Sequence, residues 1–435
     1  MKSKLLLISL LIVQFTNAQN IVFADPAFNS SLVNLPMYDA GARNLAGDNT
    51  TIDLNNDNQI SVSEAANISQ LYIRNENIVN LQGIEFFTNL KIISLYRVNV
   101  ANYDFSTLVN LESFDLSYDF YYGGVPPIGA IASINLSNCT NLKTLSLLSG
   151  QLTSLDLSNN TKLEKLSISQ QTAGLNINML NQSNLRDITY YSPFTTNLDL
   201  VNCTGLLSLN VTGLGFTFLD LSGQQIINSV AVGYTAITNL NFSNNTFLEN
   251  IYINSNSSLA GIDFGAIKDV FNLTVNDNAV TSLNLNNLIY LDYLICDGNP
   301  ITSLQIKNVI RERGIILQNV PLLQSICTDA EEVIRYKNIC NNMGMFNVIV
   351  NDACNLPAEI VNKLLKMSPN PVQDMVHFES SQKIDKVEVF GINGLMIMSE
   401  DSVTDTINMT TLQKGMYFLK VYQSGEVSEM KFIKS

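Results

Sequence analysis

The sequence predicts a mainly β protein, in which a solenoid of about twelve turns of roughly 21 residues is followed by a small C-terminal β-sandwich. Two observations predict this fold. A leucine-based unit recurs along residues 69–326, and beyond residue 367 the period gives way to short strand-like segments separated by Gly-containing turns. One such unit cannot bury its apolar side chains alone, so we expect consecutive units to stack as parallel strands.

The repeated unit reads L-x-x-L-x-L-x-x-N-x-L-x-x-L-x-L, as in residues 141–169. Its period of 21 or 22 residues is typical of a leucine-rich repeat solenoid. One longer step, between Leu116 and Leu147, indicates an insertion of roughly ten residues. The last apolar residue of each first strand lies at Ile73, Leu95, Leu116, Leu147, Ile168, Tyr190, Val211, Val232, Ile253, Val275, Cys296 and Leu317.

Side chains alternate along a strand, so the residues between these apolar positions face outward on the first sheet. That sheet would form the inner, concave face, which is the usual binding surface of a curved solenoid. Tyrosine offers a large amphipathic contact area, but it is also frequent in strands for reasons of packing alone. The candidate ligand residues on this face are Tyr72, Tyr96, Asp115, Tyr191, Tyr252, Tyr293 and Asp297.

The second half of each turn also reads as a strand, and a polar residue lies between its two apolar ones. These polar residues form a predicted ladder along the solenoid, which is either a weak cation or sugar stripe or a solvated face with stacked amides. The ladder consists of Asn135, Asp156, Asn176, Asp199, Asp220, Asn241, Asp263, Asn284 and Gln305.

The composition of the chain argues against several classes of function. The net charge is −14 and no basic patch is present, which argues against nucleic-acid binding. The chain has one histidine, His377, so multi-histidine zinc sites are excluded. We therefore expect no enzyme. The alternatives are an exported hydrolase that uses paired carboxylates, with Asp115 or the ladder aspartates as candidates, and a purely structural surface-layer component.

Residues 1–18 read as a secretory signal peptide. Lys2 and Lys4 precede an apolar stretch, and small residues end at Ala18. No other segment is apolar and long enough to cross a membrane. We expect export across the inner membrane by the general secretory route into the periplasm, and then release or display on the outer surface, where disulfides and millimolar calcium are available.

The segment DLNNDNQISVSE, residues 53–64, matches the spacing of an EF-hand calcium loop. The glycine expected at its sixth position is replaced by Asn58, the kind of non-glycine residue that best tolerates φ > 0. We expect a weak, structural calcium site, and the alternative is a polar turn. The predicted ligands are Asp53, Asn55, Asp57, Gln59 through its carbonyl, Ser61 and Glu64.

Both solenoid ends need caps. We expect an N-terminal cap over residues 19–68, with a helix that starts after Asp25, and a C-terminal cap and linker over residues 327–366. Cys139, Cys203 and Cys296 are expected to be buried thiols. Cys327–Cys354 is the predicted disulfide, which leaves Cys340 over, and Cys327–Cys340 is the alternative.

Residues 367–435 resemble the C-terminal sorting domain of bacterial type IX secretion. The matching stretches are SPNPVQD, KVEVFGINGLMI, INMTTLQKGMYFLKVY and the closing KFIKS. The resemblance implies that the type IX machinery at the outer membrane recognises this domain, and that the protein is then released or held at the cell surface.

Residues 20–354 resemble exported bacterial leucine-rich repeat proteins that carry such tails, on the stretches DLNNDNQISVSEAANISQLYI, LQGIEFFTNLK and LDLSNNTKLEKL. The resemblance implies a binding or adhesion protein whose ligand is an unidentified protein or glycan. Residues 401–403 and 405–407 also resemble the short O-glycosylation signals of such bacteria.

Overall fold

The structure is a computed structural model. It describes residues 19–35, 41–117, 131–149, 152–170, 174–309, 312–353, 366–380, 383–391, 395–423 and 426–435. The chain divides into two compact units. The first comprises the residues up to Thr302 together with Asn308–Leu323, and the second comprises Ser303–Lys307 together with Gln324–Ser435.

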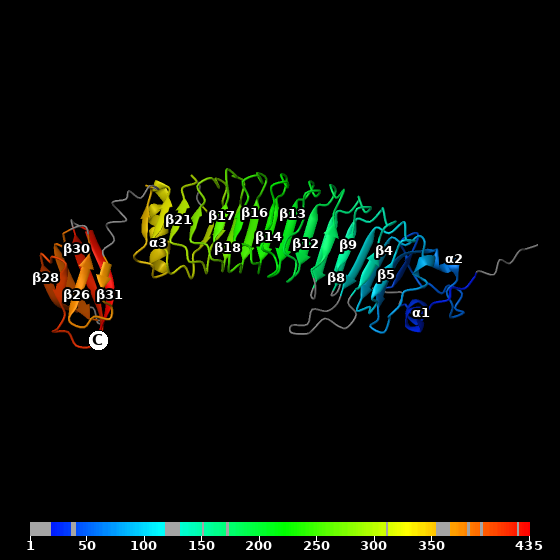
Figure 1. Ribbon diagram of the computed structural model, residues 1–435, viewed down its shortest axis with the longest axis horizontal. Helices are drawn as coiled ribbons and strands as arrows, with labels where there is room; N and C mark the ends of the chain where they lie inside the picture. The colour runs from blue at the N-terminus through cyan, green and yellow to red at the C-terminus, as the bar shows by residue number, and fades with distance from the viewer. Residues whose placement is uncertain are drawn as a thin grey trace, which may run out of the picture. The chain divides into compact units, whose positions relative to one another are not determined.

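The main sheet of the solenoid has fourteen strands (Figure 1). The strands β3 to β22 run parallel, and β1 and β2 join antiparallel at the N-terminal edge. Leaving out β1 and β2, twelve first strands are described, which confirms the predicted number of turns. In sheet order the strands are β2 (Asn49–Thr50), β1 (Ala42–Asn44), β3 (Ile68–Arg74), β4 (Ile92–Tyr96), β6 (Ser113–Ser117), β8 (Thr144–Ser149), β10 (Lys165–Gln170), β12 (Asp187–Tyr191), β13 (Ser208–Thr212), β14 (Ser229–Gly233), β16 (Asn250–Asn254), β18 (Asn272–Asn276), β20 (Tyr293–Ile295) and β22 (Gly314–Ile316).

The register is that of the repeat. Ile73 pairs with Leu95, Leu95 with Leu116, and Leu116 with Leu147 across the longer step. All twelve residues of the predicted inward row are at most 2% exposed. Each therefore packs against its equivalents in the neighbouring turns, about 4.8 Å away. The inserted segment itself lies outside the described residues.

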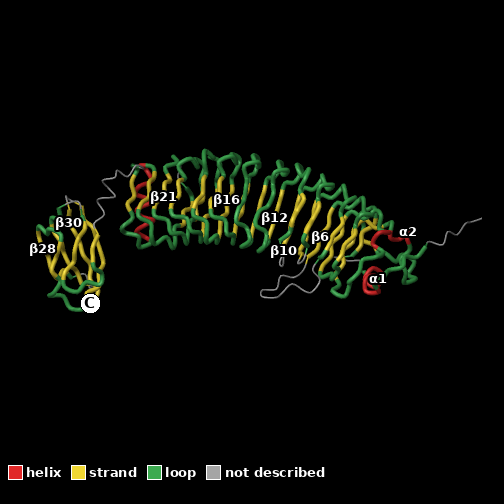
Figure 2. Tube along the Cα trace, viewed as in Figure 1, coloured by secondary structure: helices red, strands yellow, loops and turns green. Residues whose placement is uncertain are grey.

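The second strands form what we call the back row (Figure 2). Its parallel pairing is interrupted. Between β11 and β15, no strand of the described chain belongs to the back row. The strands are β5 (Asn102–Asp104) with β7 (Ser133–Asn135), β9 (Ser154–Asp156) with β11 (Asn176–Asn178), β15 (Asn239–Asn241) with β17 (Gly261–Asp263), and β19 (Ser282–Asn284) with β21 (Ser303–Ile306), β23 (Ser325–Thr328) and β24 (Ile349–Asn351).

One member of the predicted ladder is wrong. Asn178, and not Asn176, pairs with Asp156, because Ile177 pairs with Leu155. The two inward residues of this turn are therefore Ile177 and Met179, and the 4% exposed Met179 occupies a position that leucine fills in other turns.

Buried amides fasten one turn to the next. Asn160 is fully buried, and its Nδ2 donates to the carbonyl oxygens of Leu136 at 3.1 Å and Cys139 at 2.9 Å. Asn245 repeats this arrangement four turns further along, donating to Leu221 and Gln224 at 2.8 and 2.9 Å. Each of these carbonyls also accepts a backbone N–H within its own turn, so the asparagine supplies a second donor and joins neighbouring turns.

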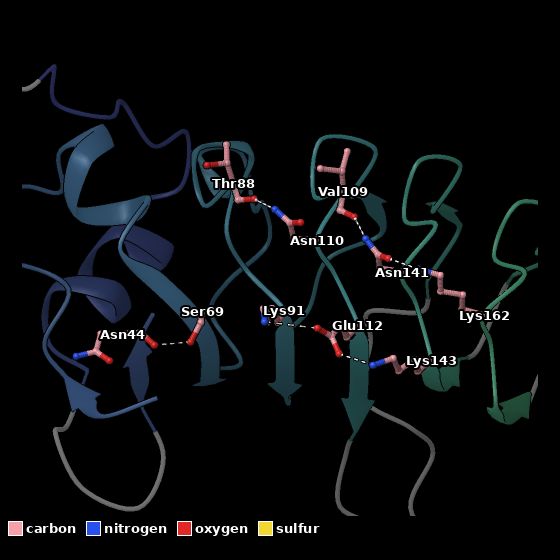
Figure 3. A network of polar contacts seen from close by, with 10 residues as sticks. All are labelled: Asn44, Ser69, Thr88, Lys91, Val109, Asn110, Glu112, Asn141, Lys143 and Lys162. Carbon is pink, nitrogen blue, oxygen red and sulfur yellow. Dashed lines mark hydrogen bonds and ion pairs between the residues drawn. The ribbon is translucent and has the colours of Figure 1, made fainter. Parts of the chain in front are cut away.

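Exposed side chains form a second set of ladders in the N-terminal turns (Figure 3). Asn110 and Asn141 each donate to a backbone carbonyl of the preceding turn, at 3.0 Å. Beside them Glu112 lies between Lys91 and Lys143, with oxygen–nitrogen distances of 3.7 and 2.8 Å. Opposite charges therefore alternate along this edge, where exposed pairs contribute at most about 1 kcal/mol each.

The N-terminal cap contains the helices α1 (Pro26–Val33) and α2 (Val62–Ala65). The Asp25 carboxylate caps α1 through the N–H of Ala27 at 2.7 Å, and it also accepts from Val79 and Asn80 in the first turn, at 2.7 and 3.0 Å. Burial alone would raise the pKa of Asp25, but these backbone donors, with Phe28, hold the pKa below its ordinary value. One side chain thus starts the helix and ties it to the solenoid.

Beyond the last turn the chain forms the 3₁₀ helix η2 (Ala330–Glu332) and the helix α3 (Val333–Asn342), and an earlier 3₁₀ helix, η1, covers Ile84–Phe86. Cys327 is disulfide-bonded, whereas Cys340 carries a free, buried thiol, so the alternative Cys327–Cys340 pairing is wrong. Cys354 lies outside the described residues, and the Cys327–Cys354 bond stays a prediction. Cys139, Cys203 and Cys296 are buried free thiols, as expected.

The C-terminal segment folds into two antiparallel sheets that share one core, which confirms the predicted small β domain. Val376, Val389 and Phe432, from three different strands, lie in this core and are fully buried. One sheet has the order β25 (Lys366–Ser368), β26 (Met375–Glu379), β29 (Thr406–Asn408), and the other β28 (Met396–Asp401), β27 (Lys386–Gly391), β30 (Gly415–Gln423), β31 (Glu426–Lys434).

Asn160→Ala should lower the free energy of unfolding by about 1–3 kcal/mol, because two buried carbonyls each lose one of their two hydrogen-bond donors. Asn159→Ala is the matched control. Asn159 is exposed and donates to the carbonyl of Ser137 at 3.2 Å, so its loss should cost less than about 0.5 kcal/mol. Urea unfolding followed by circular dichroism measures both, and equal shifts of the two midpoints would contradict this account.

Candidate functional site

Six of the seven predicted ligand residues lie on strands of the main sheet, and Asp297 follows the strand β20 closely, so that the seven form three outward rows. The central row is continuous by register, from Tyr72 through Asp115 to Tyr252. Together, however, the seven residues do not form one patch. Tyr72, Tyr96 and Asp115 are on adjacent strands, Tyr191 is alone on β12, and Tyr252, Tyr293 and Asp297 lie near β16–β20.

The N-terminal group of these residues is largely engaged within the protein. The guanidinium of Arg74 lies 4.8 Å from the centre of the Tyr96 ring, and that of Arg97 lies 5.7 Å from it. Asp115 accepts hydrogen bonds from the hydroxyls of Ser94 at 3.3 Å and Ser117 at 3.1 Å. These contacts fix the side chains in place and are favourable in their own right.

The C-terminal group is more open. Tyr293 is 45% exposed and Tyr252 38% exposed. Arg313 lies 5.5 Å from the Tyr293 ring centre and forms a two-pronged ion pair with Asp292, whose pKa is lowered by these hydrogen bonds. A Cβ at Gly314 would approach the Tyr293 ring to 2.6 Å, so only glycine lets this ring lie flat over the next strand.

Asp297 follows β20 and is partly buried. Burial raises the pKa of its carboxyl above the ordinary value, and the nearby Asp277 carboxylate adds to the rise. The backbone N–H of Gln318, which donates to Oδ1 at 2.5 Å, acts in the opposite direction on that pKa. The folded environment of Asp297 therefore disfavours the ionised form of its carboxyl group.

Sequence reasoning missed an apolar edge beside this group. It precedes strands β13 to β20 and takes over positions that hold asparagine or charged residues in the N-terminal turns. Phe271 and Tyr290 touch, with ring centres 6.2 Å apart. The sequence does contain a signal for this edge, because each of its aromatic or aliphatic residues stands directly next to an inward apolar residue of the repeat. The apolar edge consists of Leu207, Ile226, Phe247, Phe271 and Tyr290, each 41–60% exposed.

The predicted calcium loop is folded around buried anchors. Ile60 is fully buried and its carbonyl accepts from Ile21 N at 2.8 Å. Asn58 has φ 61°, the left-handed conformation expected at this position. The Asp53 carboxylate accepts from the backbone N–H of Asp57 at 3.2 Å and of Asn58 at 2.9 Å, which curls the loop around it.

The end of the loop starts α2 through a capping box. The hydroxyl of Ser61 accepts from Glu64 N at 3.2 Å, and the Glu64 carboxylate accepts from Ser61 N at 2.8 Å and from Leu54 N at 2.9 Å. Asn55 donates to Asp57 at 3.0 Å, and the Gln59 side chain accepts from Asn20 at 2.7 Å. The predicted ligands are therefore joined to one another in a compact loop.

The donor set of this loop is all oxygen and includes three carboxylates, which fits calcium in chemistry. The arrangement of these side chains, however, does not bring the three carboxylates together around one point. Within the described residues, no group of three or more His, Cys, Asp or Glu side chains is placed to hold a metal ion. Calcium binding here therefore stays a prediction.

Residues 366–435 match the family described as "Secretion system C-terminal sorting domain". The two antiparallel sheets described above are this segment. The chain is a leucine-rich repeat protein with a type IX sorting tail. The tail implies contact with the secretion machinery and export of the leucine-rich repeat protein to the cell surface or beyond.

Several solved structures are similar to the leucine-rich repeat protein. The functional domain of InlJ from Listeria monocytogenes, which "includes a cysteine ladder", has 16% identity and a TM-score of 0.36 over 95% of this chain and 97% of that one. The internalin InlF of the same species has 17% identity and a TM-score of 0.40, over 77% and 96%. A Leptospira interrogans leucine-rich repeat protein has 12% identity and a TM-score of 0.43, over 66% of this chain and 91% of that one. No curated protein matches.

Among the described residues, no helix is both long and apolar enough to cross a bilayer. The predicted signal peptide, residues 1–18, lies outside the part of the chain that the structure describes. The domain boundaries predicted for the caps and the solenoid likewise stay predictions.

Asp297→Asn should raise the melting temperature at neutral pH by about 1–2 °C. With a raised pKa in the folded state, Asp297 contributes stability below its unfolded pKa, near 3.9, and loses that contribution as the pH rises through the folded pKa. The advantage of the asparagine should therefore vanish below about pH 4.

The control for this effect is Asp292→Asn, because the pKa of Asp292 is lowered by Arg313 and the expected sign is reversed. The native Asp292 carboxylate stabilises the fold at neutral pH, and this contribution is lost as the pH falls, so Asp292→Asn should lower the melting temperature at neutral pH. Differential scanning calorimetry from pH 3.5 to 8 measures both variants. A gain from Asp297→Asn that is the same at every pH would rule out the assignment.

Proposed function

We propose that this protein is a secreted or surface-displayed binding protein, without catalytic activity, whose ligand docks on the main sheet between β16 and β20 and on the adjoining apolar edge. One observation carries the proposal. A chain with an export tail leaves Tyr252, Tyr293 and the apolar edge exposed to solvent on one side of the solenoid. Exposed aromatic clusters of this kind are the usual anchors of protein interfaces.

The C-terminal group is favoured over the N-terminal one because of its exposure and its charge. Tyr293 is flanked by the Arg313–Asp292 pair, which offers both signs of charge at the rim of the aromatic surface. Interfaces typically combine an apolar centre with such a polar rim. The ligand is a protein or glycan of the surroundings into which the tail sends the protein, by way of the general secretory route and the periplasm.

A hydrolase is the weaker candidate. A carboxylate pair needs one member with a raised pKa to act as general acid. The pKa values of Asp156 and Asp220 on the back row are both lowered, by hydrogen bonds from Ser158 and Ser222 respectively. Asp297 has a raised pKa, but its Oδ1 already accepts from Gln318 N.

The binding surface can be tested by probing a printed array of surface proteins and glycans with the full chain. Tyr252→Ala/Tyr293→Ala should reduce the strongest signal at least tenfold, since buried aromatic anchors contribute about 2 kcal/mol or more. Tyr234→Ala is the control, because Tyr234 is 61% exposed but lies outside the strands. Undiminished binding by the double variant would refute this surface.

We also propose that the loop of Asp53, Asn55, Asp57, Gln59, Ser61 and Glu64 binds calcium and stiffens the entry to the first turn. Support comes from the left-handed Asn58, the spacing of the oxygen donors and the burial of Asp53 and Glu64, which are 5% and 8% exposed. A single loop of this type is expected to bind weakly, with a Kd of about 10⁻⁴–10⁻³ M.

At about 10 mM calcium this affinity corresponds to roughly 1.4–2.7 kcal/mol of stabilisation. Calcium should therefore raise the melting temperature and slow proteolysis between residues 53 and 64, and Asp57→Asn should abolish both effects. Asp48→Asn, an exposed change outside the loop, is the control. Unchanged melting and proteolysis after chelation would show that the loop is only a polar turn.

A further inference from the structure

A groove with a volume of about 410 Å³ lies on the back row, beside the gap in its strands. Two consecutive turns line it, through residues 217–222 of one turn and residues 238–244 of the next. The volume falls within the roughly 300–1,000 Å³ of small-molecule sites. The groove lies on the back row and not on the main sheet, so it is a separate site from the surface proposed above.

The groove exists because the back row is interrupted. β15 (Asn239–Asn241) pairs with β17, and its other edge faces residues 217–221, which do not form a strand. Where two such turns do pair, as β9 and β11 do, the backbones close up through ladder hydrogen bonds. The unpaired edge leaves room for a ligand and offers it backbone groups.

Phe218 forms one side of this groove and is 60% exposed. It is an exception in its row, where an aromatic ring replaces small or polar side chains. A ring this exposed gains little from folding, so its place at a groove favours a ligand contact. The equivalent residues of the other turns are Asn102, Ser133, Ser154, Asn176, Asn197, Asn239, Gly261, Ser282 and Ser303.

Planar polar groups line the groove together with the ring, namely those of Asp220, Asn239 and Asn241. Where neighbouring second strands pair, an asparagine of the ladder bonds to the aspartate before it, as Asn178 does to Asp156 at 2.9 Å and Asn135 to Asp104 at 3.0 Å. In the described part of the chain, no hydrogen bond joins Asn241 to Asp220, the equivalent pair at the groove. The Asn241 amide donors and the remaining acceptor capacity of the Asp220 carboxylate are therefore available to a ligand.

The side chains are nevertheless held in position. Asp220 Oδ1 accepts from Ser222 N at 2.9 Å, and Asn241 Oδ1 accepts from Ser243 N at 2.8 Å. Asn239 donates to the hydroxyl of Thr238 at 3.2 Å. A side chain at position 261 would approach Asn239 Oδ1 to 2.5 Å, and the glycine there leaves this amide its place. A preordered donor and acceptor set lowers the entropy cost of binding.

We propose that this groove binds a neutral oligosaccharide, with one sugar ring stacked on Phe218 and its hydroxyls paired with Asp220, Asn239 and Asn241. A pyranose ring has an apolar face of C–H groups that packs on an aromatic ring, and a rim of hydroxyls that both donate and accept. A carboxylate accepts from two such hydroxyls, and an amide can serve as donor and acceptor at once.

The sugar is neutral because the groove already carries a negative charge. The pKa of Asp220 is lowered by the hydrogen bonds from Ser222, so its carboxyl stays ionised down to acidic pH. A uronic acid or sulfated sugar would place a second negative charge beside it, in a chain whose net charge is already −14.

The test uses the full chain and four immobilised probes, namely mannohexaose, laminarihexaose, cellohexaose and xylohexaose, in biolayer interferometry. At least one probe should bind. Phe218→Ala should then weaken its Kd about tenfold, as expected for a lost ring contact. Asp220→Asn, which keeps the size of the side chain, should weaken it at least threefold. Melting temperatures verify that both variants are folded.

Phe346→Ala is the control, because Phe346 is also an exposed ring, at 71%, but belongs to neither of the two proposed surfaces. It should leave the Kd within twofold. The inference is overturned if none of the four probes binds, or if Phe218→Ala and Phe346→Ala have equal effects. Binding that is lost in Tyr252→Ala/Tyr293→Ala but kept in Phe218→Ala would also overturn it, while supporting the surface on the main sheet.

Discussion

The stacking register dominates this structure. Because each turn repeats the positions of the one before it, every side chain has as its nearest neighbours the residues 21 or 22 places away in either direction. Leucine beside leucine yields a dry interior, and buried amides such as Asn160 close the carbonyls between turns. The stability of the solenoid therefore depends on contacts between adjacent turns and not on contacts between distant ones.

The same constraint allows surface chemistry to vary by region. One edge position carries alternating charges in the N-terminal turns, and further along it holds Leu207 and Phe271 of the apolar edge. One ladder position bridges Asp156 to Asn178, but three turns later no such hydrogen bond joins Asp220 to Asn241 among the described residues. In such a protein, candidate functional residues are those that differ from the residues at the same position of other turns, and comparing equivalent positions identifies them.

Sequence reasoning succeeded wherever the period alone decides. The inward row, the outward central row and the number of turns follow from leucine spacing, and Asn58 adopts the backbone conformation that its position in the loop demands. It went wrong at Asn176, because Met179 stands where a leucine was sought. It could not find the groove, since whether residues 217–221 pair with their neighbour depends on backbone geometry and not on apolar pattern.

The charged edge of the N-terminal turns limits how this solenoid can change in length. Lys91, Glu112, Lys143 and Glu164 occupy equivalent places in four successive turns, with their signs alternating. Deleting one of these turns would set two like charges side by side, whereas deleting two keeps the alternation intact. In this stretch, growth or loss of the array by even numbers of turns is electrostatically neutral, and odd numbers are penalised.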